Sequence, residues 1–429
     1  MHCKGVPVST RYAVCAQVRL STMADTDSLS AGRPEKLIRR EEFLQRQSAA
    51  RKKASEASLD GLVVYSRGGS AVDMHAEVFY LANHYSPHPY FADHQGLGSA
   101  RSHAVLVLPV DGPATLIVDG PWWRPDLVVA DDVRPAQDIG AEVARALRDS
   151  GLVGTRIGLV GTSFMSAAAY RGLQQHMSRK TSLVVADTLI EELRRVKSPA
   201  ELEVLRRGAL IGSRAVDAMM AAVGEGNREV DAVRAAADVI VGSGAVMYDM
   251  PTTSGRLAHH FLWSRLPTYD PYRPMERGDW FHADCYGAYG GYLWDFGRTT
   301  VVGGDPNEDQ VVVLEASVSL VEYLTAIVRP GVTAGEVHQS GMQWLCEAVA
   351  DTPLALDEEE SPVLGHGLGL TWESPWLRPN DGVELEPGMY LALEGFLGVE
   401  GVGGVFHEDN GLVTPTGFET WSTARMRWW

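Results

Sequence analysis

Short apolar runs alternate with amphipathic segments in the first half of the chain. Strands are predicted where a run of β-branched, aliphatic or aromatic residues is bounded by turn residues, namely at 61–65, 77–83, 103–109, 114–118 and 156–160. A charged helix is predicted over 37–57, and further helices over 140–151 and 164–177. Strands interleaved with helices predict an α/β domain built on one sheet.

A helix start at Ser198 opens the second half of the chain. Ser198 can cap the first turn, Pro199 suits the first helical position, and Glu201 can complete a capping box. Two amphipathic helices are predicted from there to about Val241. The sequence therefore predicts that a new domain begins just before this helix start.

The chain divides into three segments, and the two domains are expected to meet near Val196. Residues 1–35 lack a sustained apolar run, so no secretory signal peptide is expected, and their composition predicts disorder. Met23 opens a stretch that resembles an ordinary translation start, which leaves the true start open. An N-terminal α/β domain is expected over 36–195, and a second domain over 196–429.

Composition and charge narrow the class of protein. With 429 residues and 45% hydrophobic content, the chain is long enough for two domains with real cores. The net charge of −17 argues against nucleic acid and anionic membranes as partners. The sequence contains no run of about eighteen apolar residues, so we expect no transmembrane helix. The cysteines show no paired spacing, which favours a reducing, cytoplasmic location; they are Cys3, Cys15, Cys285 and Cys346.

Five potential metal ligands lie in apolar or glycine-rich stretches of the second domain. They are Asp284, Asp295, His366, Glu394 and Glu408. A single acidic residue at a strand end is usually solvated, but a carboxylate inside a buried strand costs several kcal/mol unless it is paired or binds a metal. Carboxylates can bridge two ions and a neutral imidazole can bind one, so the set predicts two divalent cations of the Mn, Fe, Co or Zn kind. Such a pair activates a water and polarises a carbonyl.

The stretches around these residues resemble a known family. The matching segments are 282–300, 365–375, 385–395 and 406–417, within a resemblance that runs from about Arg195 to Trp421. They are similar to the pita-bread metallohydrolases, which include methionine aminopeptidase, aminopeptidase P, proline dipeptidase and creatinase. The resemblance implies an α/β (α+β) chain in which a creatinase-type N-terminal domain precedes a pita-bread catalytic domain.

The resemblance also implies a role for each of the five ligands. Asp284 would hold the first ion, Asp295 and Glu408 would bridge the pair, and His366 and Glu394 would hold the second ion. The implied activity is hydrolysis of a C–N bond in a small amide or dipeptide substrate of the Xaa-Pro kind. The implied assembly is a homodimer.

One position departs from the pattern of the proline-specific peptidases. Trp372 stands where those peptidases have a second histidine that binds the substrate carbonyl, and Glu373 follows it. An indole can donate one hydrogen bond but cannot take up a proton. We therefore expect an altered substrate pocket around Trp372 and Glu373 and poor activity on Xaa-Pro dipeptides. The alternative is a non-peptidase member, such as a lyase or a creatinase-like hydrolase acting on a small metabolite.

Further histidines are candidates for substrate binding. His259 and His260 lie upstream of the first ligand, roughly where family peptidases carry a substrate-binding histidine, and the sequence does not choose between them. The alternative is a pair of surface loop residues. A loop rich in histidine and aromatic residues includes His84, His88 and His94. This loop is either an ordinary surface loop or a segment that reaches the partner's active site in a dimer.

Overall fold

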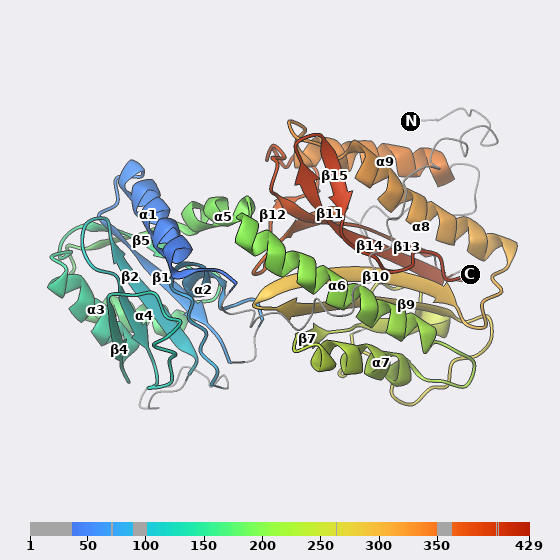
Figure 1. Ribbon diagram of the computed structural model, residues 1–429, viewed down its shortest axis with the longest axis horizontal. Helices are drawn as coiled ribbons and strands as arrows, with labels where there is room; N and C mark the ends of the chain where they lie inside the picture. Colours follow the sequence, from blue (N-terminus) through green and yellow to red (C-terminus); the bar gives the residue numbers. More distant parts are fainter. Residues whose placement is uncertain are drawn as a thin grey trace.

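The computed structural model has two domains, joined end to end by helices in the middle of the chain (Figure 1). The described residues are 37–69, 72–88, 101–262, 264–349, 363–399, 401 and 403–429. The N-terminal segment for which we expect disorder lies outside these residues.

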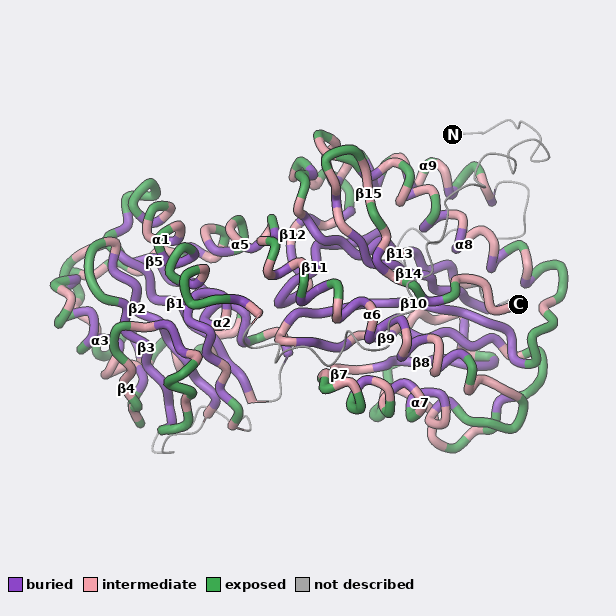
Figure 2. The backbone as a smooth tube through the Cα atoms, in the orientation of Figure 1, coloured by how far each residue is buried: buried purple, intermediate pink, exposed green. Residues whose placement is uncertain are grey.

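The N-terminal domain is built on a mixed six-stranded sheet with the order β4-β3-β2-β1-β5-β6. Its strands are β1 (Gly61–Arg67), β2 (His103–Pro109), β3 (Thr115–Val118), β4 (Asp132–Pro135), β5 (Arg156–Val160) and β6 (Ser182–Val185). Its helices are α1 (Arg40–Glu56), α2 (Ala76–Ala82), α3 (Ile139–Asp149), α4 (Ala167–His176) and α5 (Asp187–Arg195). The central strands β1 and β2 are buried along their whole length (Figure 2).

Alternating side chains of the sheet enter two different cores. Val63 and Val105 pack with α3 and α4 on one face, whereas Leu62 and Leu106 pack with α1, α2 and α5 on the other. Helices on both faces explain why these strands are apolar without interruption. This arrangement confirms the predicted α/β domain with one sheet.

The strand predicted at 77–83 is wrong, because these residues form the short helix α2. Nearly every residue of α2 is buried, and periodicity cannot distinguish a short buried helix from a buried strand. Ala76, Leu81 and Ala82 have high helix propensity, which favours the helix. Asn83 ends it in a left-handed conformation with φ of 50°.

The predicted helix start at Ser198 is confirmed. The Ser198 side chain accepts a hydrogen bond from the Glu201 amide, and the Glu201 side chain accepts one from the Ser198 amide. The helices that follow are α6 (Pro199–Ala221) and α7 (Glu229–Gly242). The proposed domain boundary at Val196 falls between α5 and α6.

Two antiparallel sheets form the core of the second domain. The first contains β7 (Val246–Asp249), β8 (Thr252–Ser254), β9 (Trp280–Tyr289) and β10 (Tyr292–Val301). The second contains β11 (Gly365–Leu368), β12 (Trp372–Trp376), β13 (Tyr390–Val399), β14 (Gly403–Thr414) and β15 (Gly417–Thr420), in the order β12-β11-β13-β14-β15. Helix α6 packs on β9 and β10, and helix α8 (Glu308–Ile327) packs on β13 and β14, followed by α9 (Ala334–Val349) (Figure 1).

Helix α8 is long and apolar enough to cross a membrane, judged by length and composition within the described part of the chain. Half of its apolar window is buried inside the protein. The residues that it buries include Leu314, Leu320 and Leu324, which pack with Leu391 and Leu393 of β13. This packing is that of a core helix, and one such helix is weak evidence for a membrane span.

Candidate metal centre

The β9–β10 hairpin brings two aspartates onto one face of the first sheet. Gly290 and Gly291 form its two-residue turn with φ of 59° and 89°, and positive φ at both positions is what a type I′ hairpin requires. In the resulting register, Asp295 lies opposite Tyr286, two residues along β9 from Asp284. Because side chains alternate along a strand, Asp284 and Asp295 share a face.

Three further candidate ligands share one face of the second sheet. Glu394 of β13 lies directly opposite Glu408 of β14. His366 of β11 lies opposite Ala392, which is two residues from Glu394 and on the same face of β13. The registers of three neighbouring strands therefore place an imidazole beside two carboxylates.

The two sheets bring these groups together around His366. Its Nε2 atom lies 3.8 Å from Oδ2 of Asp295, 3.8 Å from Oε1 of Glu394 and 3.9 Å from Oε1 of Glu408. Among the described residues, Asp295, His366 and Glu408 each offer a ligand atom within 4.8 Å of the others. The carboxyl group of Asp284 faces that of Asp295. All five residues singled out in the sequence thus lie in one cluster.

The chemistry of this cluster fits a bound cation. In the described part of the chain, four of its buried carboxylate oxygens have no hydrogen-bond partner: Oδ1 of Asp284, Oδ1 of Asp295 and both oxygens of Glu408. A buried polar atom without a partner costs about 1–3 kcal/mol, and more when it is charged. Divalent cations would satisfy these oxygens, and neutral His366 would complete the donor set.

Burial changes the protonation of the cluster. Burial raises the pKa values of Asp284 and Glu408 well above their usual range, and the Asp295 carboxylate adds to both shifts. Burial likewise raises the pKa of Glu394 to about 8, again with a contribution from Asp295. Burial lowers the pKa of His366, which keeps its imidazole neutral. Without a cation, this cluster does not hold four negative charges near neutral pH.

We expect the metal-free protein to lose stability as the pH rises from about 5 to 8. A carboxyl group whose pKa is higher in the folded state stabilises the fold below its unfolded pKa of about 4.3, and this contribution is lost as the pH rises through the folded value. For Glu394 that value is about 8. Melting temperatures in EDTA should therefore fall over this range, and added Mn²⁺ should restore them most at the upper end. A metal-free protein that becomes more stable towards pH 8 would contradict this expectation.

A layer of hydrogen bonds fixes the strands that carry the ligands. The Asn410 side chain accepts a bond from the Asp295 amide (2.8 Å) and donates one to the Asp295 carbonyl (2.6 Å). Arg298 donates to the Glu408 carbonyl (2.6 Å) and to the Asp409 carboxylate (2.7 Å). These bonds tie β10 to β14 across the two sheets. We did not predict Asn410 or Arg298 from the sequence, where the only signal was their closeness to the ligands.

Trp372 touches a candidate ligand directly. Its indole Nε1 donates a hydrogen bond of 2.5 Å to Oδ2 of Asp295. Its ring centroid lies 5.4 Å from that of Tyr248 and 5.2 Å from that of Tyr286, so three half-buried aromatic rings pack beside the cluster. Glu373, the next residue, binds Arg194 and Lys197 instead. A catalytic role for Glu373 stays a prediction that these contacts do not favour.

His259 and His260 lie in the loop after the short helix η4 (Gly255–Leu257), with their ring centroids 4.0 Å apart. The His259 Nδ1 atom lies 3.1 Å from the Arg256 carbonyl oxygen of its own loop. The His260 carbonyl oxygen lies 3.1 Å from Nε2 of buried His282 on β9. This contact ties the loop to the strand that carries Asp284, and substrate binding by either histidine stays a prediction.

The histidine-rich loop of the N-terminal domain is described only in part, and His94 lies outside the described residues. His84 is buried, with Nε2 3.3 Å from the Ser86 hydroxyl. The His88 ring stacks on Trp122 at 5.0 Å. The homodimer and the reach of this loop into a partner's site stay predictions, as does the cytoplasmic location.

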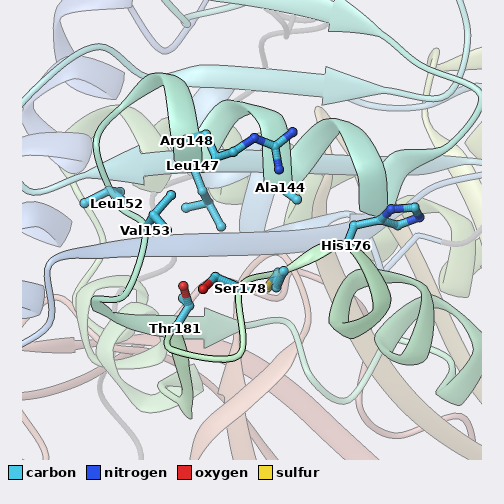
Figure 3. A pocket seen from close by; sticks show the side chains of 9 residues that line it. Ala144, Leu147, Arg148, Leu152, Val153, His176, Ser178 and Thr181 are labelled. Atoms are coloured by element: carbon cyan, nitrogen blue, oxygen red, sulfur yellow. The ribbon is translucent and has the colours of Figure 1, made fainter.

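A separate hollow lies in the N-terminal domain, between α3 and α4 (Figure 3). Its volume is about 210 Å³, and its lining includes Leu147, Arg148, His176 and Thr181. It contains none of the candidate site residues.

Fold and cluster together define a two-domain protein with a carboxylate–imidazole centre of the metallohydrolase type. The chain belongs to metallopeptidase family M24: the model of that family matches residues 203–415. The creatinase/prolidase N-terminal domain matches residues 46–196. These matches confirm the family resemblance and the expected pair of a creatinase-type domain followed by a pita-bread catalytic domain.

Similar proteins include dipeptidases. The chain is 29% identical over 234 residues to an Xaa-Pro dipeptidase of Pyrococcus furiosus, and 27% identical over 232 residues to that of Pyrococcus horikoshii. Each match covers 54% of this chain but only 64% and 63% of those proteins, which is less than two thirds of their length. The structure is similar to that of dipeptidase PepE from Mycobacterium ulcerans, with a TM-score of 0.72, 25% identity, and coverage of 92% of this chain and 98% of that one.

Proposed function

We propose that this protein is a hydrolase that depends on two divalent ions and cleaves a C–N bond in a small amide or peptide-type substrate. The observation that carries the proposal is the set of buried carboxylate oxygens without partners that converge around His366. Membership of a metallopeptidase family and the dipeptidase relatives support the same reaction class. The metal would be of the Mn, Fe, Co or Zn kind.

Each ligand has a proposed role. Asp284 would hold one ion and Asp295 and Glu408 would be shared, while His366 and Glu394 would hold the other. When bound, such ions supply an activated water and a polarised carbonyl. The role of the chain is to fix this geometry. Asp295 is held through its backbone by Asn410 and through its carboxylate by Trp372.

The aromatic rings beside the cluster set the proposed specificity. Tyr248, Tyr286 and Trp372 offer apolar surface to a substrate side chain or ring next to the reacting bond. The Trp372 N–H is already bound to Asp295, so it is not free for the substrate carbonyl, and an indole cannot take up a proton. We therefore propose a hydrolase with an altered pocket and slow turnover of Xaa-Pro dipeptides.

A non-peptidase reaction is the second candidate, and the same indole favours it. Because the Trp372 indole cannot transfer a proton, the site suits a substrate whose leaving group does not need to be protonated by the residue at this position. Tryptophan and tyrosine faces also attract cations. Creatine-like molecules and sulfonium or quaternary ammonium compounds therefore belong in the substrate panel.

The test is removal and replacement of the metal. We expect dialysis against EDTA to abolish activity on every substrate that the protein turns over, and Mn²⁺, Fe²⁺, Co²⁺ or Zn²⁺ to restore it, because buried carboxylate oxygens of the cluster find no hydrogen-bond partner among the described residues. The panel should hold Xaa-Pro and other dipeptides, creatine and dimethylsulfoniopropionate. Undiminished activity in a protein stripped of metal would exclude the proposed reaction.

A further inference from the structure

A buried group of four charged residues and one threonine lies where the two domains meet. It consists of Glu77 from α2, Arg194 from α5, Lys197, and Thr371 and Glu373 at β12, all at most 9% exposed. Arg194 donates to Glu77 (2.7 Å), Thr371 (2.7 Å) and Glu373 (2.6 Å), and Lys197 donates to the other oxygen of Glu373. Buried ion pairs are weak evidence for stability, because desolvation offsets their attraction. Stability alone therefore does not explain why these charged groups are buried here.

Trp372 lies between the two residues at β12 that Arg194 binds. Arg194 binds the side chains of Thr371 and Glu373, the residues on either side of Trp372. Since side chains alternate along a strand, Trp372 points the other way, and its indole reaches Asp295. Among the described strands, β12 lies at the edge of its sheet and pairs with β11 alone, with an irregular register. Backbone hydrogen bonds among these described strands therefore hold β12 on one side only, the side that faces β11.

We infer that Arg194 is a positioning residue for the metal centre, acting through Trp372. By gripping Thr371 and Glu373, it fixes the strand so that the indole N–H stays on Oδ2 of Asp295. That bond orients the Asp295 carboxylate, whose Oδ2 lies 3.8 Å from Nε2 of His366 and whose Oδ1 has no hydrogen-bond partner among the described residues. Through Glu77, the same guanidinium ties the N-terminal domain to the centre. The inference rests on the proposed metal centre but not on the substrate.

A double-mutant cycle in Mn²⁺ binding tests this inference without any substrate. Lysine in place of Arg194 keeps the charge, but one ammonium group cannot reproduce the planar guanidinium, which binds Glu77 through one nitrogen and Thr371 and Glu373 through the other. Groups that orient metal ligands typically contribute about 10–100-fold to affinity. We expect Arg194→Lys and Trp372→Phe each to weaken Mn²⁺ binding about tenfold by isothermal titration calorimetry. The double variant should bind no more weakly than the weaker single variant, because both changes remove the same hydrogen bond.

Arg46 provides a matched control. It is also a buried arginine of the N-terminal domain, 6% exposed, and it pairs across the domain boundary with Glu201 of α6 at 3.3 Å. Within its own helix α1 it also pairs with Glu42 at 2.5 Å. None of these partners belongs to β12. Arg46→Lys should therefore lower the melting temperature about as much as Arg194→Lys and leave the Mn²⁺ affinity unchanged.

Three results would overturn the inference. Arg194→Lys could bind Mn²⁺ with wild-type affinity, or the double variant could lose affinity by the product of the two single losses. Arg46→Lys could also lose as much Mn²⁺ affinity as Arg194→Lys. If Arg194→Lys does not fold, Thr371→Val removes only one of the bonds at nearly constant volume. A loss of Mn²⁺ affinity in Thr371→Val that disappears in the Trp372→Phe background supports the inference, and unchanged affinity rejects it. A wild-type protein that binds no Mn²⁺ would instead reject the metal centre itself.

Discussion

Glu408→Gln should lower kcat/KM by at least about 10³-fold, or about 4 kcal/mol of transition-state stabilisation. Glu408 lies opposite Glu394, 3.9 Å from the His366 imidazole, and both of its buried oxygens lack hydrogen-bond partners. Glutamine preserves the shape but removes the charge that two ions would share. Metal analysis after dialysis should show that both ions are lost, whereas His366→Ala should weaken mainly one.

The stability of this variant separates chemistry from folding. Neutralising a buried carboxylate that has no partner relieves a desolvation cost, so metal-free Glu408→Gln should melt no lower than metal-free wild type. Glu419→Gln is the control, because Glu419 lies on the adjacent strand β15, half-exposed, and pairs only weakly with Arg206 at 3.5 Å. It should keep both activity and metal. A Glu408→Gln protein that retains its ions would remove Glu408 from the proposed centre.

Trp372→His should raise kcat/KM for Xaa-Pro dipeptides by about 10²-fold. The indole N–H is bound to Asp295, and an indole neither takes up nor releases a proton near neutral pH. An imidazole at this position could donate to the substrate carbonyl and transfer a proton, and a positioned acid or base contributes about 10²–10⁴-fold. Initial rates of proline release at saturating Mn²⁺ measure the change.

Trp372→Phe controls for the loss of the indole, because it removes the N–H without adding a proton carrier. It should give no gain in dipeptide turnover. Fast wild-type cleavage of Xaa-Pro dipeptides would show that Trp372 does not set the specificity. A gain in the phenylalanine variant would mean that space in the pocket, rather than proton transfer, limits the reaction.

Local chemistry explains which parts of the fold could be predicted. The capping box at Ser198 needs only residues three apart, and it forms as predicted. The strands at 61–65 and 103–109 are β-rich runs bounded by turn residues, and they too form as predicted. The helix α2 could not be distinguished from a strand, because its environment is buried on nearly all sides.

The candidate ligands stood out because carboxylates are costly in apolar strands, whereas their supporting contacts did not. Arg194 and Glu373 are 179 positions apart, and Trp372 and Asp295 are 77 apart. Nothing in either local sequence indicates its partner. The sequence identified Trp372 as an unusual residue, but its hydrogen bond to a candidate ligand follows only from the packing of two sheets.

The central claim is that the five-residue cluster holds two divalent ions. A crystal of the active protein grown with Mn²⁺ and measured at the manganese absorption edge tests it most directly. We expect two anomalous peaks about 3.5–4 Å apart, with Asp295 and Glu408 bound to both and His366 bound to one. Active crystals with no anomalous peak within bonding distance of these side chains would contradict the account.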